Sequence, residues 1–324
     1  NVANTVSLTT GTQKNQTYVS VGAVNARGII QNNDLDRYNF SVRNTTSMLN
    51  DKLTMDLSFM YSNVKEQNML SQGEYANPLV PVYLFPRGDD FSKYQYYERY
   101  DVDRNIKTQF WPLKENGLSM QNPYWITNRN MYTNKKDRFL ASGSLKYTIT
   151  DWLNVSGRVK LDKETINSEK KMYASTLNVI AENSDKGAYV QSNKNTSQIY
   201  ADAMLNINKY FYHDTWNLTA SLGASLLDLD YKELNFGGGL LTIPNLFTSN
   251  NANVSGKLTY KNTNYHDRTN SLFGTFSLGY KGMVYVDGSL RNDWISALAG
   301  TNHSSILYPS IGASAILTNM FTMK

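Results

Sequence analysis

The sequence predicts an all-β fold, and within that class a section of a transmembrane antiparallel β-barrel. Apolar and polar residues alternate with a period of two over segments of about 10–14 residues. The connections between these segments are in turn very short and very long. No run approaches the roughly 18 consecutive apolar residues of a membrane-spanning helix. We therefore expect residues 1–324 to form one partial barrel domain of eleven or twelve strands.

The alternation separates an apolar face from a strongly polar one. It recurs at 38–48, 53–62, 139–149 and 216–226. Strands of a soluble sandwich are usually shorter, about 5–6 residues, whereas barrel strands need about 9–11 residues with apolar side chains toward lipid and polar ones toward the lumen. We expect Leu57, Val155 and Leu222 to face lipid. In the segment 153–162 the apolar positions are Leu153, Val155, Gly157, Val159 and Leu161, and the polar ones are Asn154, Ser156, Arg158, Lys160 and Asp162.

The lengths of the connections are a second, independent indication. Tight turns are expected at 50–52, 150–151 and 281–282. Short turns at one end and long loops at the other are typical of outer-membrane barrels. The strand near Ser255–Tyr260 has the weakest pattern. The long loops are predicted at about 65–136, 164–195, 232–267 and 293–307, and we expect them to be extracellular.

Composition excludes several other classes. There is no cysteine, so disulfides and thiolate metal sites are ruled out. The net charge of +5 comes from scattered lysines and arginines, and no block of like charge predicts nucleic-acid binding. Tyrosine accounts for 23 residues, many near strand ends, which fits either an interfacial girdle or simple β-propensity.

Two stretches of the chain carry a resemblance to a known family. The first stretch comprises Asn4–Gly11, Gln16–Gly22, Gly28–Ile29 and Asp36–Asn39, and the second comprises Tyr280–Gly282, Leu290–Ser296 and Tyr308–Ser310. The second stretch is the more specific, because a tight turn, a strand and a polar loop follow one another in the expected order. Both stretches resemble the SusC/RagA-type TonB-dependent transporters of Bacteroidetes.

The resemblance implies a function and a set of partners. Members of this family resemble 22-stranded barrels filled by a plug, covered by a SusD-like lipoprotein lid and powered by TonB–ExbB–ExbD. They import glycans or oligopeptides across the bacterial outer membrane. The chain departs from the family pattern, since the plug, the TonB box and the closing C-terminal strands are absent and about half the strands are present. We expect an internal barrel section in contact with outer-membrane lipid.

The sequence contains no recognisable catalytic motif. The three histidines stand in predicted turns or loops without a partner at metal-ligand spacing, and no nucleophile elbow or phosphate-binding loop occurs. We predict neither enzyme activity nor a cofactor. Asp101, Asp103 and Asn105 copy the first ligand positions of a calcium loop, but Ile106 and Pro112 stand where that loop needs glycine and glutamate. A solvated charge cluster is the simpler interpretation, with a looser Ca²⁺ site as the alternative.

The loop 78–125 is the expected binding region, because it is rich in aromatic residues. Exposed aromatics stack on sugar rings, grip extended peptides or form protein–protein hot spots. The alternative is that the loop packs against itself. The residues predicted to contact substrate or lid are Tyr83, Phe85, Tyr94, Tyr96, Tyr97, Trp111 and Trp125.

Three functional hypotheses follow. The first is a nutrient importer, the second a passive porin or surface adhesin with the same architecture, and the third a soluble all-β glycan-binding domain. The apolar faces argue against the third. The stretch 291–296 and the size of the loops favour the importer.

Overall fold

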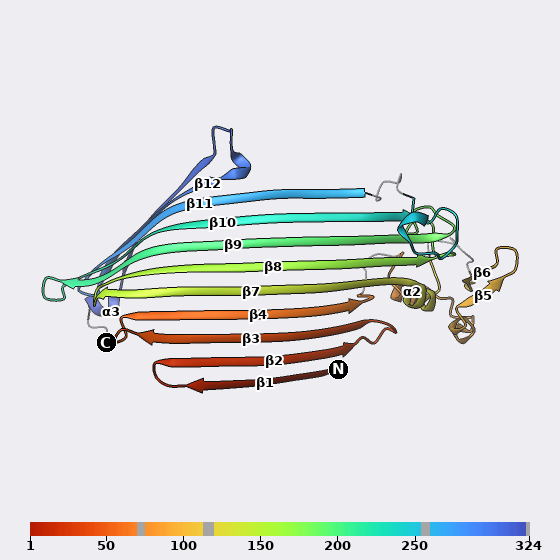
Figure 1. Ribbon diagram of the computed structural model, residues 1–324, viewed down its shortest axis with the longest axis horizontal. Helices are drawn as coiled ribbons and strands as arrows, with labels where there is room; N and C mark the ends of the chain where they lie inside the picture. The colour runs from red at the N-terminus through yellow and green to blue at the C-terminus, as the bar shows by residue number, and fades with distance from the viewer. Residues whose placement is uncertain (70–74, 113–119, 254–259, 322–324) are drawn as a thin grey trace.

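The computed structural model describes residues 1–69, 75–112, 120–253 and 260–321, and it contains one large antiparallel sheet (Figure 1). Its eleven strands lie side by side in the order in which they follow one another along the chain, so that each inner strand pairs with two others and the first and last strands pair with one. The sheet consists of β1 (Val2–Gly11), β2 (Asn15–Arg27), β3 (Asp34–Met48), β4 (Leu53–Gln67), β7 (Asn130–Thr150), β8 (Leu153–Tyr173), β9 (Gly187–Phe211), β10 (Trp216–Gly239), β11 (Tyr260–Tyr280), β12 (Val284–Ile295) and β13 (Ser305–Ala315).

The remaining elements are short. A separate hairpin is formed by β5 (Glu98–Asp101) and β6 (Ile106–Gln109). The helices are α1 (Leu79–Tyr83), α2 (Pro123–Arg129) and α3 (Leu317–Met320), with 3₁₀ turns η1 (Phe91–Gln95), η3 (Ser249–Asn251) and η4 (Ser296–Leu298). No helix in the described part of the chain is long and apolar enough to cross a membrane.

The register joins the apolar residues of all eleven strands into one band. Because side chains alternate between the two faces, residues opposite one another in a ladder lie on the same face. One such row runs through Leu8, Val19, Val42, Phe59, Ala141, Leu161 and Ile199, and another through Tyr147, Val155, Leu205, Leu222, Gly274, Leu290 and Pro309. Leu57, Val155 and Leu222 all belong to this band and are exposed, as expected for side chains that face lipid.

The opposite face, called here the polar face, carries charged groups in the middle of the strands. Several of these groups are paired across neighbouring strands, which lowers the cost of placing charge beside a sheet that is apolar on its other side. Three arginine–aspartate bridges lie on it: Arg43–Asp56 at 2.7 Å, Arg138–Asp162 at 2.5 Å and Arg158–Asp202 at 2.7 Å. The polar face is the one expected to line the lumen.

Aromatic and charged residues mark both edges of the apolar band. Near the tight turns, the rings of Trp216 and Tyr280 pack with centroids 4.8 Å apart. At the other edge the Tyr61 hydroxyl donates to Asp137 at 2.6 Å. Tyr61 is the next residue on the apolar face of β4 after Phe59, which belongs to the first of the two rows. The five apolar positions from Leu153 to Leu161 span roughly 20 Å when the strand is tilted by about 40°, which is close to the ~25 Å apolar band of outer-membrane barrels.

The tight turns use left-handed backbone. Lys281 and Gly282, between β11 and β12, have φ values of 50° and 65°. Two successive left-handed residues form the type I′ turn, whose twist matches that of the flanking strands. The predicted tight turn at 281–282 is therefore confirmed.

The strands extend well beyond the ends that the sequence predicted, so that the loops are shorter. The strands of the sheet reach Gln67, Tyr173, Gly239 and Ile295 and resume at Asn130, Gly187, Tyr260 and Ser305, all inside the predicted loops 65–136, 164–195, 232–267 and 293–307. Above the apolar band the ladders continue with polar residues on both faces, so the period-two signal stops although the pairing does not. The strand expected near 255–260 lies mostly outside the described residues, and β11 begins at Tyr260.

A charge on the apolar band is predicted to impair membrane assembly. Leu222→Lys places an ammonium group near the middle of the band, at a cost of about 2–4 kcal/mol. Thr219→Lys is the matched control, because it lies on the polar face of the same strand. Assembly is measured as the folded fraction recovered from outer membranes. Equal recovery of the two variants would contradict the face assignment.

Candidate functional site

The loops at the end of the sheet opposite the tight turns fold over the polar face. Figure 1 shows α2, β5 and β6 gathered at this end. Lys170 and Met172 share the parity of Arg158 in β8, so their side chains point to the polar face. Met172 packs there with Ala181 and Ala188. We call residues 75–112, 120–129 and 174–186 the loop platform.

The platform has its own aromatic core. Tyr94 and Trp111 are buried, with ring centroids 5.4 Å apart. Phe85 lies 5.5 Å from each of them, and Phe110 lies 5.1 Å from Tyr94. Edge-to-face and tilted pairs at these distances add about 0.5–1.5 kcal/mol each beyond the burial of apolar area. A long loop is thus held in one conformation by packing.

The α2 helix inserts the largest buried side chain of the platform. Asn122 caps this helix, and its side-chain oxygen accepts from the backbone N–H of Tyr124 at 2.8 Å. Trp125 is 0% exposed, and its Nε1 donates to Thr176 Oγ1 at 3.0 Å. The Thr176 hydroxyl donates in turn to Asn130 Oδ1 at 2.7 Å. Trp125 therefore joins the long loop to the 174–186 loop.

Buried side-chain amides also connect the long loop to the 174–186 loop. Gln109 donates from its backbone to Ser175 Oγ at 2.8 Å and from Nε2 to the Ser175 carbonyl at 2.7 Å. The fully buried Gln121 accepts from the backbone N–H of Leu177 at 3.0 Å. Buried polar groups need such partners, so these side chains fix the relative position of the two loops.

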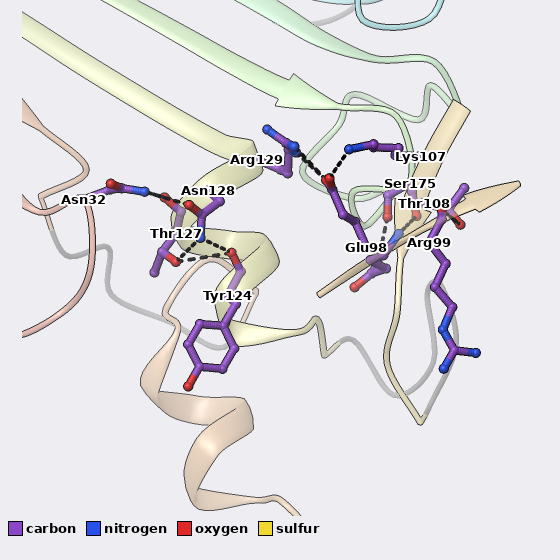
Figure 2. Close-up of polar contacts among 11 residues, drawn as sticks. Asn32, Glu98, Arg99, Lys107, Thr108, Tyr124, Thr127, Asn128, Arg129 and Ser175 are labelled. Carbon is purple, nitrogen blue, oxygen red and sulfur yellow. Dashed lines mark hydrogen bonds and ion pairs between the residues drawn. The ribbon is translucent and has the colours of Figure 1, made fainter. Parts of the chain in front are cut away.

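Figure 2 shows the ion-pair cluster that fixes the β5–β6 hairpin. The Glu98 carboxylate accepts from Arg129 Nη2 at 2.7 Å and from Lys107 Nζ at 2.7 Å. Burial acts to raise the pKa of Glu98, but the hydrogen bonds from Lys107 and Arg129 outweigh it, so that the pKa lies below its usual value. The Arg129 guanidinium also lies 5.0 Å from the Tyr173 ring centroid.

The connection between β2 and β3 holds the other side of α2. The side-chain amide of Asn32 donates to the Thr127 carbonyl at 3.1 Å and to Asn128 Oδ1 at 2.9 Å (Figure 2). Asn68, just after β4, donates to the same Thr127 carbonyl at 3.1 Å. The platform is thus tied to the first strands of the sheet as well as to β7–β9.

The residues predicted to contact substrate or lid fall into two groups. The prediction for Tyr94, Trp111 and Trp125 needs correction, because they are buried inside the platform and hold it together. Phe85 and Tyr97 are half-buried beside them. Tyr83 and Tyr96 are 85% and 71% exposed, and they remain available for a ligand or partner. Alternation and composition could not separate these groups, because both consist of aromatic residues in one loop.

The calcium candidates lie in the turn of the β5–β6 hairpin. Asp101 Oδ1 accepts from the backbone N–H groups of Asp103 and Arg104, both at 3.1 Å, and so serves the turn. The Asn105 side chain accepts from the Tyr100 hydroxyl. Over the described ranges there is no group of three or more acidic, histidine or cysteine side chains suited to a metal. The Ca²⁺ alternative stays a sequence prediction.

A cavity of about 290 Å³ lies between the platform and the polar face. Its wall is mainly apolar, with Ile126, Met131 and Met172 among its members, and it includes Asn130 and Lys170. Sequence reasoning missed this site, because Lys170 fell within the predicted loop 164–195 rather than on a strand with a defined face.

Removal of the Trp125 ring is predicted to loosen the platform without unfolding the sheet. Trp125→Ala should cost about 3–5 kcal/mol of local stability, since it leaves a cavity and removes the hydrogen bond that Thr176 Oγ1 accepts. Tyr83→Ala is the control, because its ring is exposed. Limited proteolysis of residues 75–129 in the assembled protein measures the difference. Equal resistance of the two variants would show that Trp125 does not hold the loop.

Acid is predicted to release the β5–β6 hairpin through Glu98. The pKa of Glu98 is lower in the folded protein than its ordinary value of 4.5, so its stabilising effect is present above pH 4.5. The effect is lost as the pH falls through the lowered folded-state pKa. Hydrogen exchange of residues 98–109 between pH 6 and pH 3 should therefore lose protection in the wild type. In Glu98→Gln, which cannot titrate, exchange corrected for intrinsic rates should show no step at this pH.

No family model and no curated protein matches the chain. Among solved structures, the chain is similar to the RagAB peptide transporter, with a TM-score of 0.71 and 14% identity over 99% of this chain and 35% of that one. The closed-closed state of the RagAB peptide importer gives 0.66 and 16% identity over 99% and 34%.

A more distant similarity points to the same architecture. BauA, the ferric preacinetobactin receptor from Acinetobacter baumannii, gives a TM-score of 0.53 at 9% identity over 96% of this chain and 41% of that one. These proteins are transporters and receptors rather than enzymes. The chain spans about a third of the length of the RagAB chains it matches. It has the fold of a section of such a transporter barrel, as the resemblance to SusC/RagA-type transporters implied.

Proposed function

We propose that the chain is part of the barrel of a TonB-dependent importer in the bacterial outer membrane. The observation that carries this proposal is the pairing of a continuous apolar band with a charged polar face whose open end is overlaid by the loop platform. A sheet with these two faces suits lipid on its apolar side and an aqueous lumen on its polar side. The folds of the RagAB peptide transporter and of the ferric preacinetobactin receptor support import over a passive role.

The platform suits gated uptake in particular. It is held together by buried aromatic rings and hydrogen-bonded side-chain amides. It therefore forms an ordered surface at this end of the barrel section, where flexible loops would not. Binding of cargo on one side of the membrane and its release on the other requires two states of the transporter that differ in their affinity for the cargo. The energy for this exchange would come from TonB–ExbB–ExbD, acting through a plug.

We infer an oligopeptide or a glycan as cargo and a SusD-like lipoprotein as lid. The similarity to a protein described as a peptide importer favours the peptide. Exposed tyrosines are well suited to either contact, since they combine an apolar ring with a hydroxyl. Tyr83 and Tyr96 stand on the platform with most of their surface free.

Transport is predicted to require energy coupling. In cells that express the full-length protein, uptake of labelled peptides should fall to background when tonB is deleted, while the amount of folded barrel stays the same. Uptake that continues without TonB would identify a passive porin. Glycan uptake in place of peptide uptake would retain the importer and change its cargo.

The lid contact is predicted to depend on the exposed tyrosines. Tyr83→Ala combined with Tyr96→Ala should reduce the co-purified lipoprotein several-fold, because large exposed aromatics dominate interface energies. Tyr212→Ala is the control, since Tyr212 is 78% exposed in a turn at the opposite end of the sheet. The measurement is a mild-detergent pull-down with quantification of every partner. Unchanged lipoprotein in the double variant would remove these residues from the interface.

A further inference from the structure

The cavity between the platform and the polar face is lined by a lysine that forms no ion pair with any residue in the described part of the chain. Lys170 lines it from β8. Within the described ranges no carboxylate forms an ion pair with its ammonium group, and Glu182 is the acid whose charge acts on it. Burial lowers the pKa of Lys170, with a smaller opposing effect from Glu182. Arg43, Arg138 and Arg158 on the polar face, by contrast, each pair with an aspartate.

A second donor in the cavity wall is also unused. Asn130 has its Oδ1 occupied by the Thr176 hydroxyl, which fixes the side chain. Its Nδ2 is buried and has no hydrogen-bond partner. A buried donor without a partner is unfavourable, so an acceptor placed beside it would bind favourably.

Much of the remaining wall is apolar. Ile126 and Met172 are buried, and Met69, Met131 and Ile180 also belong to this surface. Gln31, Asn68, Thr127 and Tyr132 add polar groups to the wall. Methionine side chains adapt their shape to different apolar groups. At about 290 Å³ the cavity lies at the lower limit of small-molecule pockets, which suits one or two residues or a short chain rather than a whole oligomer.

We propose that this cavity is a subsite for an aliphatic carboxylate, with the carboxylate on Lys170 and Asn130 and the aliphatic part against the methionines and isoleucines. A peptide with an apolar C-terminal residue and a short free fatty acid share this chemistry. The peptide source rests on the proposed import function, whereas the subsite itself does not. A neutral sugar lacks the anion that Lys170 requires.

The test is equilibrium binding to the full-length transporter purified in detergent, measured by calorimetry. The probes are the tripeptide Ala-Ala-Leu, its C-terminal amide, and hexanoate. We expect the free acid to bind at least tenfold more tightly than the amide, since a hydrogen bond to a charged group contributes about 1.5–3 kcal/mol. If the tripeptide binds more tightly than hexanoate, cargo peptide is the source; the reverse order identifies a fatty acid.

Variants separate the charge from the packing. Lys170→Met should lower the affinity for the free acid to that of the amide, and Lys170→Arg should retain most of it. Lys160→Met is the matched control, because Lys160 lies on the same face of the same strand, outside the cavity. Equal binding of acid and amide by the wild type, or unchanged affinity in Lys170→Met, would overturn the subsite. These measurements need no TonB, so their failure leaves the uptake experiment as a separate test of import.

Discussion

The structure depends on one constraint, which is that no backbone amide can remain unpaired in the hydrocarbon of a membrane. A sheet meets this constraint only when every strand is hydrogen-bonded along its whole depth to both neighbours. The unbroken ladders from β2 to β12 satisfy it over the apolar band, with a single register irregularity at Thr148–Thr150, beside a tight turn. Because the register is continuous, the side-chain faces are fixed as well, and one apolar band and one charged face result.

The same ladders continue above the band, where water could satisfy the backbone instead. β9 is 25 residues long and β10 is 24, about twice what crossing a bilayer needs. The additional length extends the sheet beyond the apolar band, and the 174–186 loop and α2 pack against this extension. The position of the cavity beside Lys170 is therefore a result of strand length, since a shorter β8 would end before Lys170.

The sequence predicted those parts of the fold that depend on periodicity. The faces of β4, β8 and β10 and the turn at Lys281–Gly282 follow from alternation and turn chemistry, which are local. The platform does not follow from either. Whether Trp125 is buried while Tyr83 is exposed depends on contacts with Thr176, some fifty residues away in the chain. The place of Lys170 in the cavity does not follow from periodicity either, because β8 continues past the point where its apolar alternation stops.

The way in which the platform is fastened has a bearing on how such proteins diversify. The hydrogen bonds that hold the platform in place lie on its inner side, where it meets the sheet, or between its loops. They are made by Asn32, Asn68, Glu98, Gln109 and Trp125. The outward surface, which includes Tyr83 and Tyr96, takes part in none of these bonds. Substitutions there leave the support intact. A single barrel can therefore acquire new specificities by changing its outer surface, while the concealed anchors keep each new surface at the same height above the membrane.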